Sequence, residues 1–201
     1  METPEVHIMD KIEWQIFGTL TFKKERMPHH HRLKMWYAEV RTLAKWQHVY
    51  FPELLWALRF EHGELTGRPH FHCLIGGLPK AAVSGATKIR RAGGSWDVVN
   101  RTCHAMYAKW ARMGLKESDP KDRISQFSLY DSRLNGGAYI LKCLGVDESR
   151  LSKDIYETAK FNWEADELTL SESVTRVVSA YLASQSNGKL KRMHDREQRD
   201  V

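Results

Sequence analysis

The chain has 201 residues and a formal net charge of +6 at pH 7, with 42% hydrophobic and 28% charged residues. This size and composition predict one folded domain with its own core, and the seven tryptophans argue against intrinsic disorder. Charges interrupt the apolar runs before membrane-spanning length, and the N-terminus lacks the features of a secretory signal, so we expect a cytoplasmic protein with no membrane partner. Three widely spaced cysteines favour buried thiols over disulfides. The positive charge favours an acidic partner such as nucleic acid.

The first predicted elements are a strand and a helix. Residues 14–22 are rich in aromatic and β-branched residues, which are typical of a strand. Pro28 then opens a segment that reaches Trp46, and apolar residues recur there at the three- and four-residue spacing of a helix. Three consecutive histidines at positions 29–31 fall in its first turn. For these we favour a polar helix start over a metal site.

Two further strands are predicted at 54–61 and 70–75, joined by a loop with glycine, proline and polar residues. Side chains two residues apart share one face of a strand, so His70 and His72 project together. If the two strands form a hairpin, Glu61 ends the first strand opposite the start of the second. Its carboxylate can then join the two imidazoles.

This combination of side chains predicts a divalent metal site. Two imidazoles and a carboxylate provide nitrogen and oxygen ligands and leave positions open, which suits Mg²⁺ or Mn²⁺. A closed zinc site would use four protein ligands, usually with cysteine pairs, and the chain has no CxxC. His62 and Glu64 are alternatives to Glu61 as the third ligand. Taken alone, the motif also fits a pair of strand histidines satisfied within the sheet.

The remainder of the chain is predicted to contain short strands, helices and turns. They are a basic loop or strand edge at 84–95, a strand at 96–99, a helix at 102–113, a strand at 126–130, a turn at 135–137 and a helix at 171–185. Aromatic residues of the 102–113 helix are expected in the core. Basic residues gather at Lys88, Arg90 and Arg91 and again in the C-terminal tail, which suits either a solvated surface or nucleic-acid binding.

Tyr139 and Lys142 are a second candidate for chemistry. Placed in a helix, they are three residues apart and therefore neighbours on one face. A nearby ammonium group favours the ionised form of a phenol, and phenolate is a usable nucleophile. A packed tyrosine with a hydrogen-bonded hydroxyl is the simpler interpretation of this pair when it is taken alone.

In order and separation, three motifs of the chain resemble those of the HUH endonucleases, and within them the single-tyrosine rolling-circle replication initiators. Residues 18–22 are similar to the family's first-strand motif, 70–72 to its metal motif and 139–142 to its nucleophile motif. The resemblance covers roughly residues 14 to 145. The chain has no second tyrosine one turn away from Tyr139 and no phosphate-binding loop of a fused helicase.

The resemblance implies an α+β fold with a central antiparallel β-sheet flanked by helices. The metal histidines would lie on a middle strand and the tyrosine on a helix beside them. The expected organisation is an N-terminal arm at 1–13, an endonuclease core at 14–145, a helical extension packed on the core at 146–185, and a basic tail at 186–201.

The activity implied is metal-dependent nicking and rejoining of single-stranded DNA. Glu61, His70 and His72 would hold Mn²⁺ or Mg²⁺, and Tyr139 would attack the phosphate to give a 5′-phosphotyrosine, with Lys142 as second catalytic group. The expected contacts to the DNA backbone are Arg68, Lys88, Arg90 and Arg91. The expected partners are a single-stranded origin with a hairpin and a separate helicase, in the cytoplasm of a bacterial or archaeal cell or of a virus host.

Two kinds of alternative stay open. A single-strand transposase or relaxase of the same superfamily would use the same site residues, and the transposase would act as a dimer. A non-catalytic DNA-binding module would use the two histidines only for sheet packing, and its basic loop and tail would bind DNA.

Overall fold

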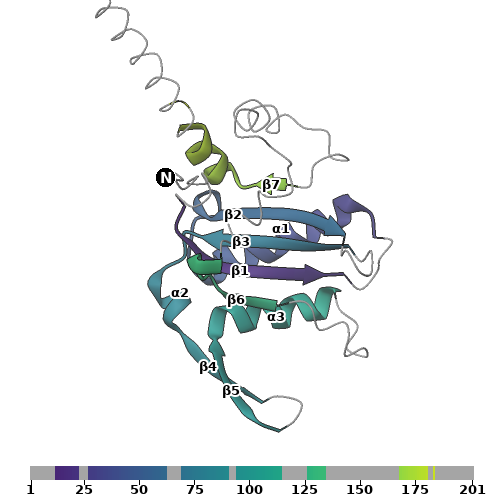
Figure 1. The fold of residues 1–201 in the computed structure, drawn as a ribbon, viewed down its shortest axis with the longest axis vertical. Helices are drawn as coiled ribbons and strands as arrows, with labels where there is room; N and C mark the ends of the chain where they lie inside the picture. The colour runs from purple at the N-terminus through teal and green to yellow at the C-terminus, as the bar shows by residue number, and fades with distance from the viewer. Residues whose placement is uncertain are drawn as a thin grey trace, which may run out of the picture.

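The computed structural model describes residues 12–22, 27–62, 69–90, 94–114, 126–134, 168–180 and 183, with the side chains of all of these except 61, 62, 114 and 134. An antiparallel sheet of five strands, in the order β6-β1-β3-β2-β7, forms the body, and a separate two-stranded sheet, β4-β5, extends from it (Figure 1). Helices flank the five-stranded sheet. The predicted fold class, α+β with a central antiparallel sheet, is confirmed.

The elements follow the chain in a simple order. The strands are β1 (Trp14–Thr21), β2 (Leu55–His62), β3 (Pro69–Gly76), β4 (Ala86–Arg90), β5 (Trp96–Asn100), β6 (Gln126–Leu129) and β7 (Leu168–Leu170). The helices are α1 (His29–Trp46), α2 (Lys80–Ser84), α3 (Arg101–Gly114) and a helix over 172–180, with short 3₁₀ helices at Phe51–Glu53 and Ser132–Leu134. None of the described helices has the length and apolarity of a membrane span.

One face of the sheet forms the main core with α1 and α3. Alternate residues of the three central strands point to this face, and they meet the apolar stripes of the two helices. Its members include Leu20, Trp36, Val40, Leu43, Leu58, Phe71, Cys73, Met106 and Trp110. The Trp110 indole also donates a hydrogen bond to the Thr21 carbonyl at 3.0 Å, which joins α3 to β1. The aromatics of α3 therefore lie in the core, as their spacing predicts.

The opposite face of the sheet is apolar at one end only. There Trp14, Ala57 and Leu74 pack with Val174 and Val178 of the 172–180 helix. The Ser171 hydroxyl accepts hydrogen bonds from the amides of Trp56 at 3.1 Å and Val174 at 3.3 Å. This residue therefore caps the helix N-terminus and joins it to β2. The remaining end of this face is polar.

The first turn of α1 is a helix start, as predicted. His29 packs edge-on against the Phe60 ring, with centroids 5.0 Å apart, and burial is the main cause that lowers its pKa. His30 and His31 are exposed. On the same turn Arg32 is buried, and its guanidinium lies 5.1 Å from the Phe60 ring centroid.

Some elements differ from the prediction. The 84–95 segment, predicted as a basic loop or strand edge, contains the strand β4, and α2 and β7 have no predicted counterpart. Residues 1–11 and all of 135–167, which includes the predicted turn at 135–137, lie outside the described residues. The two described cysteines, Cys73 and Cys103, are buried free thiols, and burial raises the pKa of Cys103 to about 12.

Gly18 shows why the first-strand motif begins with glycine. A Cβ on Gly18 would lie 2.7 Å from Cys73 Sγ and 2.7 Å from the Phe127 ring, closer than packed atoms approach. The absence of a side chain at Gly18 thus lets Cys73 of β3 and Phe127 of β6 pack against β1 on the helix side of the sheet.

We expect Gly18→Ala to lower the free energy of unfolding by about 1–3 kcal/mol, because the added methyl overpacks a filled core. Urea denaturation measures this change. Ser128→Ala, at an exposed position of β6, is the control and should change stability by less than about 0.5 kcal/mol. A Gly18→Ala protein as stable as the unmodified one would contradict the packing argument.

An ion pair between a buried carboxylate and a partly exposed ammonium group joins α1 to α3. Lys109 Nζ lies 3.2 Å from Glu39 Oε2, and the Glu39 side chain is almost fully buried. Burial raises the pKa of Glu39, and the neighbouring ammonium opposes that shift.

We expect Lys109→Met to destabilise the protein by about 1–3 kcal/mol near pH 8, because it leaves a buried carboxylate without its cation. The pKa of Glu39 then rises further in the folded state. The variant therefore loses stability as pH rises through the raised pKa of Glu39. Its loss of unfolding free energy relative to the unmodified protein should be smaller at pH 5 than at pH 8. Denaturation at both pH values, with Lys34→Met as exposed control on α1, tests this. A deficit independent of pH would exclude the ion-pair explanation.

Candidate metal centre

The candidate site lies where β3 runs between β1 and β2. On the β1 side, His70 pairs with Thr21 and His72 with Thr19. On the β2 side, the same two residues pair with Glu61 and Arg59. Directly opposite residues of antiparallel strands share a face. One face of the sheet therefore carries, at one end, the row Thr19, Thr21, Arg59, Glu61, His70 and His72.

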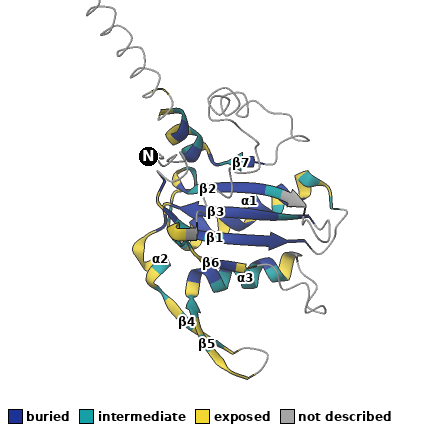
Figure 2. Ribbon diagram, viewed as in Figure 1, coloured by how far each residue is buried: buried dark blue, intermediate teal, exposed yellow. Residues whose placement is uncertain are grey.

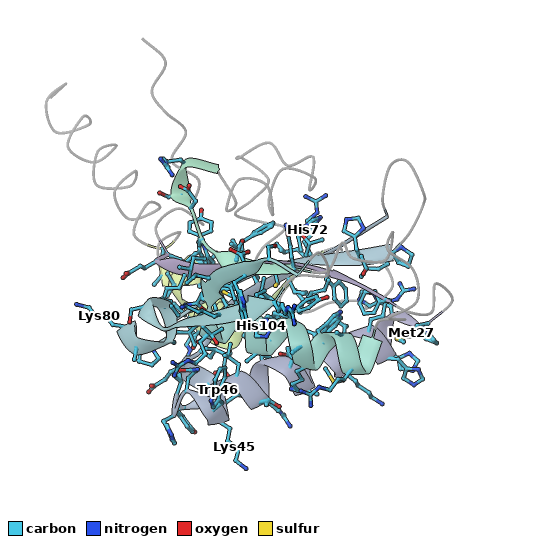
Figure 3. The ribbon with its side chains drawn as sticks, turned by 90° about the horizontal axis from the view of Figure 1, so that it is seen from below. Met27, Lys45, Trp46, His72, Lys80 and His104 are labelled. Carbon is cyan, nitrogen blue, oxygen red and sulfur yellow. The ribbon has the colours of Figure 1, made fainter. Side chains whose placement is uncertain are left out.

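This row is on the side of the sheet away from the main helix core. Phe71 and Cys73, the residues that alternate with the histidines, are buried between the sheet and the helices α1 and α3. Figure 3 shows His72 across the sheet from Trp46 and Lys45, which lie at the end of α1. The strand alternation predicted from the sequence thus describes both faces of β3.

The Nε2 atoms of the two imidazoles approach each other closely. His70 Nε2 and His72 Nε2 are 3.0 Å apart, and the ring planes are nearly perpendicular at 89°. Two ligand atoms that each lie about 2.1 Å from an ion are about 3.0 Å apart at a right angle and about 3.4 Å apart at a tetrahedral angle. The observed separation therefore fits adjacent positions of an octahedral ion such as Mn²⁺ or Mg²⁺.

His72 is held in this orientation by its surroundings. Its Nδ1 lies 3.1 Å from Thr19 Oγ1, and the Phe17 ring stacks on the imidazole with centroids 5.9 Å apart. If Nδ1 carries the proton, it donates to Thr19, and Nε2, next to His70 Nε2, is the nitrogen that carries the lone pair. His72 is only 8% exposed, so the ring has little freedom to turn.

The same geometry also fits a hydrogen bond between the two imidazole rings. With His72 protonated at Nδ1 and His70 at Nε2, the His70 N–H donates to His72 Nε2 across 3.0 Å. Metal binding would replace this hydrogen bond. The arrangement is therefore compatible with a bound ion and with a hydrogen-bonded histidine pair. A titration with metal separates these two states.

The backbone favours Glu61 as the third ligand. Glu61 pairs with His70 and so belongs to the histidine face, whereas His62 pairs with Pro69 and belongs to the other face. The side chains of both residues, and Glu64, lie outside the described residues. Among the side chains that the structure describes, no group of three histidine, cysteine, aspartate or glutamate residues is placed to hold a metal.

The other predicted site residues divide into two sets. Tyr139, Lys142, Arg68 and Arg91 lie outside the described residues. Lys88 and Arg90 belong to the β4-β5 sheet, which points away from the five-stranded body (Figure 1). The structure therefore does not bring Lys88 and Arg90 to the histidines.

Sequence reasoning missed two residues of the site. Arg59 is 3% exposed and lies opposite His72, so its guanidinium belongs to the same face as the imidazoles. Its position two residues before Glu61 is a signal that the strand alternation already contained. The role of Thr19 depends on the pairing register between β1 and β3, and no local pattern reveals that register.

We expect the protein to bind one Mn²⁺ and the double change His70→Ala, His72→Ala to abolish that binding, because it removes both nitrogen ligands. Isothermal titration calorimetry measures the affinity and the stoichiometry. His31→Ala, an exposed histidine of α1, is the matched control and should bind as the unmodified protein does. Equal Mn²⁺ uptake by the double variant would place the metal elsewhere.

Thr19 gives a separate test of the orientation of His72. Thr19→Val keeps the side-chain shape and removes the hydroxyl, so we expect the Mn²⁺ affinity to fall by about 10-fold or more. Thr19→Ser should restore most of it, since the hydroxyl returns. If the valine and serine variants bind Mn²⁺ equally, the hydroxyl does not position the ring.

Comparisons of the chain with protein-family models, with curated protein sequences and with solved structures give no match. The residues and their geometry are therefore what bears on function. They comprise a histidine pair with convergent nitrogens, a hydroxyl that orients one ring, and a buried guanidinium on the same face.

Proposed function

We propose that the protein is a metal-dependent endonuclease that nicks and rejoins single-stranded DNA, as the replication initiator of a rolling-circle replicon. The observation that carries the proposal is the close approach of His70 and His72 on the middle strand of an antiparallel sheet, with Nε2 atoms 3.0 Å apart. The order of the motifs along the chain supports it, since the first-strand motif that begins at Gly18 precedes the histidines and Tyr139 follows them.

In this proposal His70, His72 and Glu61 hold Mn²⁺ or Mg²⁺. When bound, the ion polarises the scissile phosphate and offsets the negative charge that builds on its oxygens. Thr19 keeps the His72 ring turned toward the ion. Arg59 supplies a fixed positive charge on the same face, which favours an anionic group such as a phosphodiester over a neutral ligand.

Tyr139 is the proposed nucleophile. Its hydroxyl loses a proton, the phenolate oxygen forms a bond to phosphorus, and the bond from phosphorus to the 3′ oxygen breaks. The 3′ oxygen gains a proton, so the products are a 5′-phosphotyrosine and a free 3′-hydroxyl. Lys142 holds the phenolate or contacts the phosphate. Because one phosphate ester replaces another, the reverse attack by a 3′-hydroxyl rejoins the strand without ATP.

The proposed partners follow from this chemistry. The DNA is a single-stranded origin segment with a hairpin, and strand separation falls to a separate helicase in the same cytoplasm, of a bacterial or archaeal cell or of a virus host. A transposase or relaxase of the same superfamily would share the residues of the site. Light scattering distinguishes the transposase, because that enzyme would be a stable dimer.

We expect incubation with pooled single-stranded oligonucleotides and Mn²⁺ to give a covalent protein–DNA band on a denaturing gel. Tyr139→Phe should abolish the band, because the variant lacks the attacking oxygen. Tyr50→Phe, an exposed tyrosine before the 51–53 turn, is the matched control and should keep it. A band that survives in Tyr139→Phe would move the nucleophile, and metal-independent DNA binding without any band would favour the non-catalytic module.

A further inference from the structure

The β4-β5 sheet is an arm with two different faces. Its two strands pair with each other only, and the arm extends from the body beyond α2 and α3 (Figure 1). Exposure alternates along β4, and Figure 2 shows that much of the arm is exposed. Arg90 pairs with Trp96, and Lys88 pairs with Val98. These four residues share the outer face of the arm.

The outer face combines aromatic surface with positive charge. Trp96 is 68% exposed and Val98 is 63% exposed, although both are apolar. Each of them pairs with a basic residue on β4, and both basic residues, Arg90 and Lys88, are exposed. The inner face differs, because Ile89 and Val99 are half-buried and the acidic residue Asp97 belongs to that side. The two basic residues thus belong to the outer face and the acidic residue to the inner face.

The base of the arm is fixed to the body. The Asn100 side-chain amide donates hydrogen bonds to the carbonyls of Ala82 at 3.1 Å, Val83 at 2.9 Å and Gly85 at 3.0 Å, and its oxygen accepts one from the Cys103 amide at 3.0 Å. The Arg101 amide donates to the Gly85 carbonyl at 2.8 Å. These bonds connect α2 and Gly85, the residue before β4, to β5 and α3. Trp96 is therefore presented on a defined scaffold.

We propose that the outer face of the β4-β5 arm binds single-stranded DNA, with the Trp96 ring stacked on an unpaired base and Lys88 and Arg90 on neighbouring phosphates. Stacking on aromatic side chains beside basic groups is how proteins hold single strands without reading their sequence. The inference rests on the proposed function for the identity of the nucleic acid as DNA. It adds a contact away from the histidine face, because the arm belongs to a different sheet.

The side chains favour a single strand over a duplex. A two-stranded ribbon can enter the major groove, but readout there depends on side chains that form paired hydrogen bonds with base edges. On the outer face only Lys88 and Arg90 could form such bonds, because Trp96 has one N–H donor and Val98 has none. An exposed ring face matches the face of a base, and base faces are accessible only where bases are unpaired.

The test measures DNA binding in EDTA, so that metal-dependent nicking does not contribute. Fluorescence polarisation of a labelled oligothymidylate of about 20 nucleotides reports the affinity of the full chain. We expect Trp96→Ala to weaken binding by about 10-fold and Trp96→Phe to retain most of it. Trp46→Ala removes a partly exposed tryptophan at the end of α1 and is the matched control, with affinity unchanged.

Charge is tested by the salt dependence of the same binding. Lys88→Gln with Arg90→Gln removes two phosphate contacts, so the slope of log affinity against log salt should become shallower by about 1.4. An unchanged slope, or a Trp96→Ala protein that binds oligothymidylate as tightly as the Trp46→Ala control, overturns the proposal. Equal weakening of duplex and single-stranded binding by Trp96→Ala overturns the stacking assignment as well.

Failure of the arm and failure of the proposed nicking activity give different results. If Trp96→Ala weakens binding in EDTA while no covalent band forms with Mn²⁺, DNA binding by the arm is supported and the endonuclease proposal is contradicted. If the Tyr139-dependent band forms and Trp96→Ala leaves the oligothymidylate affinity unchanged, DNA binding by the arm is contradicted and the endonuclease proposal is supported.

Discussion

The antiparallel register of β3 between β1 and β2 is the constraint on which the rest of this structure depends. It brings two histidines into one row with Thr19 and Arg59, and it sends Phe71 into the helix-side core. Because side chains alternate, a slip of one residue would exchange these two sets, burying the imidazoles under α1 and exposing the aromatic ring. The energy that fixes the register comes from the apolar face. The polar face is positioned by that packing and does not itself hold the strand in place.

Neighbouring residues of β1 serve the two faces of the sheet. Gly18 has no side chain because Cys73 and the Phe127 ring close over it on the helix side. The next residue, Thr19, contacts His72 on the other side. A short first-strand motif of a small residue followed by a hydroxyl thus has two separate physical causes, one in core packing and one in the orientation of an imidazole.

Much of the fold follows from the sequence, because long periodic segments specify their own type. The strands at 14–22 and 70–75 were predictable from their composition and the neighbouring turn residues, and the helix from Pro28 to Trp46 from the spacing of its apolar residues. The five-residue helix α2 and three-residue strand β7 are too short for a periodic signal, and the glycines and charges around the arm strand β4 left both a basic loop and a strand edge as interpretations of that segment. Within the site, alternation predicts the histidine face, but the Thr19 contact depends on pairing across 53 residues, which no local pattern encodes. Tyr139 and Lys142 lie outside the described residues and stay predictions.

The central claim is that His70 and His72 bind the same ion through their convergent nitrogens. Pulsed electron paramagnetic resonance of the Mn²⁺-loaded protein tests this directly, because nitrogens bonded to the ion give resolved hyperfine couplings. We expect couplings from two imidazoles in the unmodified protein and from one in His72→Ala. Bound Mn²⁺ without any imidazole coupling would contradict this claim, and the two histidines would then be a hydrogen-bonded pair within the sheet.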